Sequence, residues 1–119
     1  MKQIILVLVL ICSSFSAVAA TEKRTLLIAT DITAYRAHSI NHSNVDVRNA
    51  HMVWATGLEG GCNSVYYFAD KDTFLHSAVI SGLLKDEKVT VIYDVDSTTR
   101  APWGDTTSCQ LTSFTIQLN

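Results

Sequence analysis

One stretch of this chain has the spacing of a helix, and the stretches around it read as strands. Between residues 70 and 85, apolar side chains recur at intervals of three and four, which is typical of an amphipathic α-helix. Five other stretches alternate or are rich in β-branched and aromatic residues, and they predict strands: 24–36, 46–56, 64–69, 88–94 and 112–118. The first fits either one strand or a bent pair. The pattern therefore predicts a mainly β fold with one helix, in the order β-β-β-α-β-β.

The predicted helix also has expected ends and an expected packing face. Asp70 is a plausible N-cap because its carboxylate can accept unpaired amide hydrogens of the first turn. Phe74, Leu75 and Ala78 are expected to pack on the sheet. Gly82 is either a weak point of the helix or a place where another segment packs closely.

The first twenty residues have the order of a secretory signal peptide. Lys2 supplies a positive charge, residues 4–11 are apolar, and cleavage after Ala19 or Ala20 fits the small residues there. The apolar run is shorter than the roughly 20 residues that a membrane-spanning helix needs. We expect residues 1–20 to be removed and 21–119 to form a single domain, periplasmic or secreted, with no membrane anchor after cleavage.

Two cysteines, Cys62 and Cys109, lie in the expected mature chain. An even pair in a small exported domain usually forms a disulfide, and a loop of this length predicts a stabilisation of roughly 4 kcal/mol. The alternative is a Cys/His metal site, but neither cysteine has a second Cys or a His within four residues. The sequence predicts the disulfide Cys62–Cys109.

Charge restricts the classes of ligand. The chain has 9 Lys and Arg against 11 Asp and Glu, for a net charge of −2. A non-specific nucleic-acid binder would normally have a basic excess, so we expect no nucleic-acid partner.

The order of elements, with the stretch 53–57, the Gly60-Gly61-Cys62 turn and a second Cys before the last strand, resembles a known group. It is similar to small exported bacterial disulfide-bonded proteins, mostly uncharacterised, and more distantly to the OB-fold B subunits of subtilase-cytotoxin-like and enterotoxin-like toxins. The resemblance implies an OB-fold-like small barrel and again a disulfide between Cys62 and Cys109. It transfers no sugar-contacting residue to this chain.

Groupings that would support catalysis are weak. His38 and His42 are four residues apart and would ligate a metal if helical, but their neighbours favour a turn. Asp94 and Asp96 end a strand, and the residues after them do not complete a calcium loop. We expect no enzyme and no cofactor. The alternative is a small periplasmic enzyme or metal-binding protein that uses one of these two pairs.

The preferred function is therefore a non-enzymatic binding module whose ligand is a glycan or a protein. Most aromatic residues, including the strand residue Trp54, are expected in the core. Trp103 lies in a polar loop with Arg100 and Asp105 close by, and these three are the candidate ligand-binding residues.

The sequence also suggests self-association. Ile80 and Leu84 lie four residues apart and form, with His76, a row offset from the expected packing face of the helix. In the toxin-like B subunits such a row faces neighbouring helices across a ring. We therefore expect a homo-oligomer, with a pentamer as the form that the resemblance implies.

Overall fold

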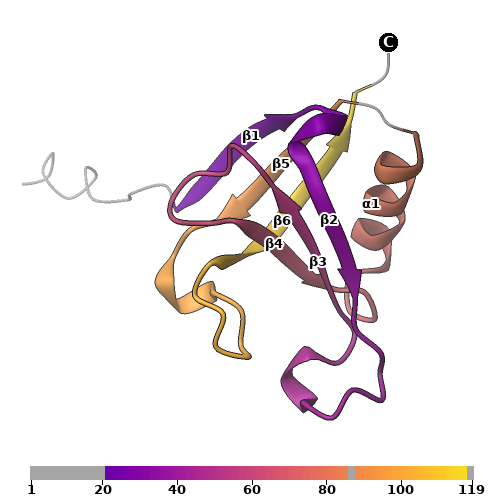
Figure 1. Cartoon of the computed structure of the whole chain (residues 1–119), viewed down its shortest axis with the longest axis vertical. Helices are drawn as coiled ribbons and strands as arrows, with labels where there is room; N and C mark the ends of the chain where they lie inside the picture. The colour runs from indigo at the N-terminus through magenta and orange to yellow at the C-terminus, as the bar shows by residue number, and fades with distance from the viewer. Residues whose placement is uncertain (1–20, 86–87, 118–119) are drawn as a thin grey trace, which may run out of the picture.

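The computed structural model describes residues 21–85 and 88–117, so the predicted signal peptide lies outside the described residues. These residues form one helix and six strands (Figure 1). The strands are β1 (Glu22–Leu27), β2 (Ile32–Ala37), β3 (Ala50–Ala55), β4 (Ser64–Phe68), β5 (Val89–Asp94) and β6 (Ser108–Ile116), and the helix is α1 (Thr73–Lys85). The predicted mainly β fold with one helix is confirmed.

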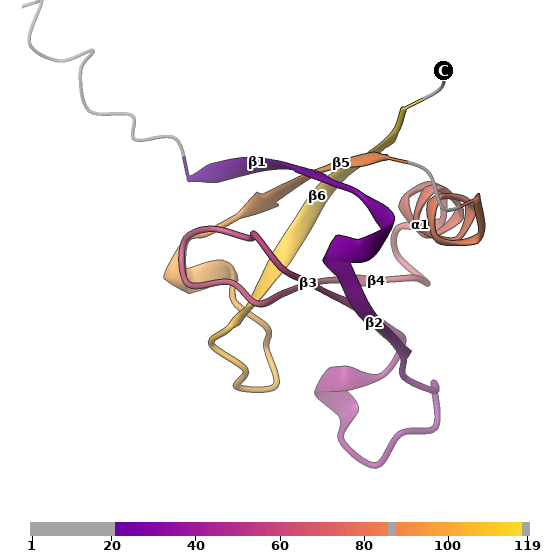
Figure 2. The same cartoon turned by 45° about the horizontal axis from the view of Figure 1, so that its top comes forward.

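The strands form one mixed sheet in the order β1-β5-β6-β4-β3-β2. Neighbours are antiparallel except β4 and β6, which run parallel. β1 and β2 are the two edges of this sheet, which the pairings among the described residues do not close into a barrel. α1 lies in the connection between β4 and β5, on one side of the sheet, while the loops 38–49 and 95–107 extend from the same end of the molecule in both views (Figures 1 and 2).

The predicted first stretch is a pair of strands, because the chain turns at Asp31. The Asp31 carboxylate accepts a hydrogen bond from the Ile28 amide at 2.8 Å, and its carbonyl accepts one from the Thr56 amide at 2.7 Å. Short polar side chains that bind nearby backbone amides interrupt regular pairing. A 3-10 turn at Ala29–Asp31 therefore separates β1 from β2, as the bent-pair alternative predicted.

α1 packs on the sheet through Leu75 and Ala78, as predicted, but not through Phe74. Val79 and Gly82 are buried, whereas Phe74 is 91% exposed. A Cβ at Gly82 would lie 2.6 Å from the Phe114 ring, so β6 approaches the helix closely there, as one of the two interpretations of Gly82 predicted. The prediction for Phe74 is wrong, because the helix turns the stripe of Leu75, Val79 and Gly82 toward the sheet.

Three predicted boundaries also differ from the structure. α1 begins at Thr73, so Asp70 is not its N-cap. Residues 45–47 form a 3-10 turn that precedes β3. β6 begins at Ser108, four residues before the predicted strand 112–118, since parallel pairing with β4 starts there. No helix among residues 21–85 and 88–117 is long and apolar enough to cross a membrane.

Cys62 and Cys109 form the predicted disulfide, with their Cα atoms 5.8 Å apart. Cys62 lies just before β4 and Cys109 is the second residue of β6, where it pairs with Val65. The bond therefore joins the two strands that run parallel. It lies in a core whose largest fully buried side chains are Tyr93, Leu27, Val53, Val65, Val79, Val89 and Val91.

Candidate ligand-binding face

The strands β3 and β4 present different side chains on their two faces. Alternate residues point to opposite sides of a strand. On one side, Val53, Ala55, Val65 and Tyr67 belong to the main core. On the other side lies a second, smaller cluster in which buried Met52, Tyr66 and Ala101 contact half-buried Trp54, Phe68 and Trp103. We call Trp54, Tyr66, Phe68 and Trp103 the aromatic face.

Tyr66 holds the centre of the aromatic face. Its ring centroid is 5.3 Å from that of Trp103 and 5.9 Å from that of Phe68, both edge to face. Its hydroxyl donates to the Thr99 carbonyl at 2.6 Å. Burial and the nearby Asp94 carboxylate raise the pKa of Tyr66, so the phenol stays protonated. The loop 95–107 is thereby fixed over β4.

Cations lie over both ends of the aromatic face. The Arg36 guanidinium carbon is 5.1 Å from the Trp54 ring centroid, and the Lys71 Nζ atom is 5.1 Å from that of Phe68. Trp54 pairs with Ser64, while Phe68 pairs with Ala50, so the two rings are at opposite ends of the β3–β4 ladder. Each ring therefore combines an aromatic surface with a charged hydrogen-bond donor.

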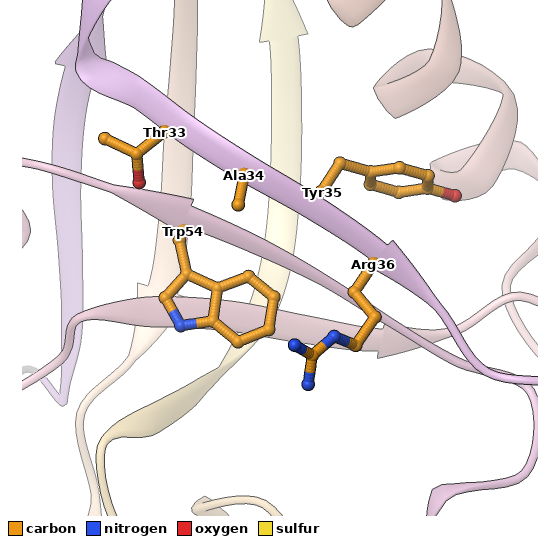
Figure 3. A pocket seen from close by; sticks show the side chains of 5 residues that line it. All are labelled: Thr33, Ala34, Tyr35, Arg36 and Trp54. Carbon is orange, nitrogen blue, oxygen red and sulfur yellow. The ribbon is translucent and has the colours of Figure 1, made fainter.

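A hollow lies at each of these ends. The first has a volume of about 330 Å³ and is lined by Thr33, Ala34, Tyr35, Arg36 and Trp54 (Figure 3). Trp54 and Arg36 lie on one side of β2, and Tyr35 extends toward α1 on the other. The second measures about 380 Å³ and is lined by Val45, Asp46, Arg48, Asn49, Phe68, Asp70, Lys71 and Pro102. Both volumes are in the range of small-ligand sites, roughly 300–1,000 Å³.

Of the three predicted ligand-binding residues, Trp103 belongs to the aromatic face, and Arg100 and Asp105 have partners within the protein. Arg100 donates from Nη2 to the carbonyls of Gly60 and Val95, both at 2.8 Å. The Asp105 carboxylate accepts from the amide and hydroxyl of Thr107. Arg100 and Asp105 thus shape the loop that carries Trp103.

The position of Trp54 in the structure differs from the position that the sequence predicted. Trp54 was expected in the core, whereas the structure has it half-buried and lining the first hollow. Trp54 pairs with Ala34 of β2, and Arg36, two residues farther along β2, lies on the same face with its guanidinium over the Trp54 ring.

The two pairs that the sequence offered for catalysis or metal binding, His38 with His42 and Asp94 with Asp96, form hydrogen bonds to other groups of the protein. The rings of His38 and His42 are 5.5 Å apart, but the two Nδ1 atoms bond separately to the Ala50 carbonyl and the Asn44 amide. Asp94 Oδ1 accepts from the Asp96 amide, and Asp96 Oδ1 in turn caps the turn at Thr98. Those hydrogen bonds lower the pKa of Asp96. Within residues 21–85 and 88–117, no three His, Cys, Asp or Glu side chains form a group that could hold a metal.

A second polar cluster lies on the side of the sheet that faces α1. Tyr35 from β2 bonds to Nδ1 of His51 from β3, and Tyr67 from β4 bonds to Nδ1 of His76 from α1 at 2.8 Å. The two imidazole rings are 4.6 Å apart, centroid to centroid. Burial lowers the pKa of His51, as do His76 and His38, and burial raises the pKa of Tyr67.

Comparison of the chain with protein-family models, curated proteins and solved structures finds no match. Functional inference for this protein therefore rests on the geometry of the aromatic face and of the Tyr–His cluster.

Proposed function

We propose that this protein is an exported, non-enzymatic binding module that holds a glycan on its aromatic face. The observation that carries the proposal is the position of Trp54, Tyr66, Phe68 and Trp103 over β3 and β4, beside the loops 38–49 and 95–107. Cations over Trp54 and Phe68 complete the two ends.

The proposal includes an OB-like barrel. β1 and β2 are joined by only four residues, yet they pair at opposite edges of the sheet, with β5 and β3. If they count as two halves of one bent strand, five strands remain with the helix after the third, which is the OB order. OB-folds bind oligosaccharides and oligonucleotides on strands 2 and 3 and the loops beside them. In this numbering those elements are β3, β4 and the loops around the aromatic face.

Charge and chemistry favour a glycan over the other OB ligand. Sugar rings present C–H faces that stack on aromatic rings, and hydroxyls that bond to charged donors such as Arg36. An oligonucleotide needs an electropositive groove as well as stacking. The chain has a net charge of −2, and Asp46 and Asp70 line the second hollow beside its two cations.

Export is supported by the disulfide, because such bonds persist mainly in oxidising compartments. Together with the signal-like segment 1–20, this favours the periplasm or the medium. The likeness to toxin B subunits belongs to the same proposal, since those proteins are exported OB-folds.

A glycan array probed with the purified oxidised protein tests the function. The best-bound glycan is then titrated by calorimetry against Trp54→Ala and the control Phe74→Ala, which removes an exposed aromatic ring on α1. We expect Trp54→Ala to weaken binding at least tenfold and Phe74→Ala to leave it unchanged.

Other outcomes lead to the alternative functions. An array without any bound glycan would contradict the proposal and favour a protein ligand for the aromatic face. Glycan binding that survives Trp54→Ala would place the ligand elsewhere. Turnover of a bound glycan, abolished by changes at His38, His42, Asp94 or Asp96, would favour the enzyme alternative.

We also propose that the molecule forms a homo-oligomer. Phe74 and Leu84 are 91% and 81% exposed on α1, and β1 and β2 are sheet edges with unpaired backbone groups. The predicted row of His76, Ile80 and Leu84 is not exposed as a whole, because the His76 side chain bonds to Tyr67. Phe74, which is not part of that row, is exposed instead. A second copy would cover both the apolar residues and an edge strand.

A further inference from the structure

Tyr35, His51, Tyr67 and His76 form a cluster on the opposite side of the sheet from the aromatic face, and of these four residues Tyr35 also lines the first hollow. Each residue comes from a different element: β2, β3, β4 and α1 respectively. His51 and Tyr67 are directly opposite each other in the β3–β4 ladder, and Tyr35 is diagonal to His51 across the β2–β3 ladder. The sheet register therefore places three of the four groups on one face, and α1 supplies the fourth.

The four polar atoms point toward one another. The Tyr35 hydroxyl contacts His51 Nδ1, and the Tyr67 hydroxyl contacts His76 Nδ1. The His51 ring stacks on the Tyr67 ring at 5.4 Å and meets the His76 ring edge-on at 4.6 Å. With the phenols as donors, each imidazole carries its proton on Nε2, and its Nδ1 lone pair points into the cluster.

The cluster is open on one side and closed on the other. Tyr67 is buried, His51 and His76 are half-buried, and Tyr35 is 37% exposed on an edge strand. A small ion can therefore reach the phenol of Tyr35 from solvent, while the inner groups are already held by packing. Side chains whose rotamers are fixed by packing and hydrogen bonds give a binding site its precise geometry.

We propose that Tyr35, His51, Tyr67 and His76 bind a transition-metal ion that accepts both phenolate oxygen and imidazole nitrogen, with divalent copper as the tightest-binding divalent member. Imidazole suits copper, iron and zinc, and copper heads the divalent series in affinity. The metal replaces the two phenolic protons, which pass to solvent, and no electron is transferred. Two phenolates and two neutral imidazoles then balance the charge of the divalent ion, so the half-buried site remains neutral.

The test is a titration of the oxidised protein with Cu(II), followed by visible absorption and calorimetry. We expect one equivalent to bind and to produce a phenolate-to-copper charge-transfer band. Ca(II), which prefers oxygen ligands only, should not bind. Intact mass records whether residues 1–20 are present, and a Cys12→Ser background is used if they are, because the Cys12 thiol would bind copper.

Two variants at the cluster and one control decide the assignment. Tyr35→Phe removes an exposed hydroxyl, so the fold is retained, and the charge-transfer band should weaken while affinity falls by at least the roughly 10–100-fold that losing an outer-shell partner costs. His51→Gln should lower affinity similarly. Tyr93→Phe, which removes a hydroxyl bonded to Thr25 and to the Glu59 amide and not to a cluster residue, should change neither readout.

Three results would overturn the proposal. They are no copper binding at micromolar protein, binding without a charge-transfer band, and binding that is lost in His42→Gln but kept in Tyr35→Phe. The last result would assign the metal to the loop pair His38 and His42. A failure of this site would leave glycan binding untouched, because Trp54 and the aromatic face lie on the other side of the sheet.

Discussion

Arg100 connects several segments of the molecule through a single side chain. Its guanidinium donates to carbonyls of Gly60, Val95 and Thr106, and its Nη1 atom lies 2.9 Å from the Cys109 sulfur. It therefore joins the turn before β4, the end of β5 and the loop that carries Trp103. The sequence marked Arg100 as a candidate ligand contact because it is a charged loop residue, and its partners became visible only with the fold.

Arg100→Lys should destabilise the protein by roughly 2 kcal/mol or more. An ammonium cannot reach carbonyls on several segments at once, and partly buried acceptors are then left unpaired. Urea unfolding of the oxidised protein measures the change, with Arg24→Lys on exposed β1 as the control. An unchanged midpoint would mean that the guanidinium contacts contribute nothing to folding.

Predictions for single residues were correct where few pairings were chemically possible. They were wrong where the burial of a side chain depends on the surrounding fold. Once residues 1–20 were interpreted as a signal peptide, Cys62 and Cys109 had one possible pairing, and the disulfide was predicted correctly. The exposure of Trp54 depends on which face of β3 packs on the main core, which no local pattern encodes. The Tyr–His cluster was missed for the same reason, since its four residues are brought together only by strand register and by the rotation of α1.

At the scale of elements, α1 illustrates both the strength and the limit of sequence periodicity. The spacing predicted a helix, and the structure has it at Thr73–Lys85. Phe74 was wrongly predicted to be buried, because apolar residues occur almost all round this helix and the spacing alone does not show which of them face the sheet. Only contact with the sheet, at Val79 and Gly82, fixes its rotation.

Gly82→Ala should lower the melting temperature by several degrees. Alanine in a helix interior is favoured over glycine by about 1 kcal/mol. The new methyl would, however, lie 2.6 Å from the Phe114 ring and 3.2 Å from Val89, and overpacking of this kind costs about 1–3 kcal/mol. Ser77→Ala on the exposed side of α1 is the control, measured by the same thermal melt. A raised melting temperature for Gly82→Ala would contradict the close helix–sheet contact.

At the scale of the whole molecule, the amino-acid sequence predicted the order of the elements along the chain. It did not predict the order of the strands in the sheet. Alternation predicted the strands, and Asp31 explains why the first stretch bends into two. Pairing of β4 with β6 joins segments separated by the helix and β5, and no local signal specifies such a contact. The disulfide was a long-range constraint that the cysteine count and the predicted export indicated.

Self-association is the prediction that belongs to this scale. Light scattering of the oxidised protein at micromolar concentration should give a mass several times that of one chain. The double variant Phe74→Ser, Leu84→Ser should lower that mass, because it removes the exposed apolar side chains of α1. Ile40→Ser, which changes an exposed residue of the loop 38–49, should not. A monomer mass for the unaltered protein would contradict the proposed oligomer.

The disulfide also decides where a single proteolytic cut releases a fragment. A cut outside the segment between the two cysteines separates the chain into two pieces, and a cut inside that segment does not. Everything between Cys62 and Cys109 lies on one covalent ring, which includes α1, β5 and the exposed loop 95–107. A protease that cuts this loop once leaves both fragments joined through sulfur. A cut in the loop 38–49 instead frees β1 and β2 from covalent attachment to the rest, and only strand pairing then retains them. Of the two loops beside the aromatic face, 95–107 is therefore the one that can be nicked without loss of any part of the molecule.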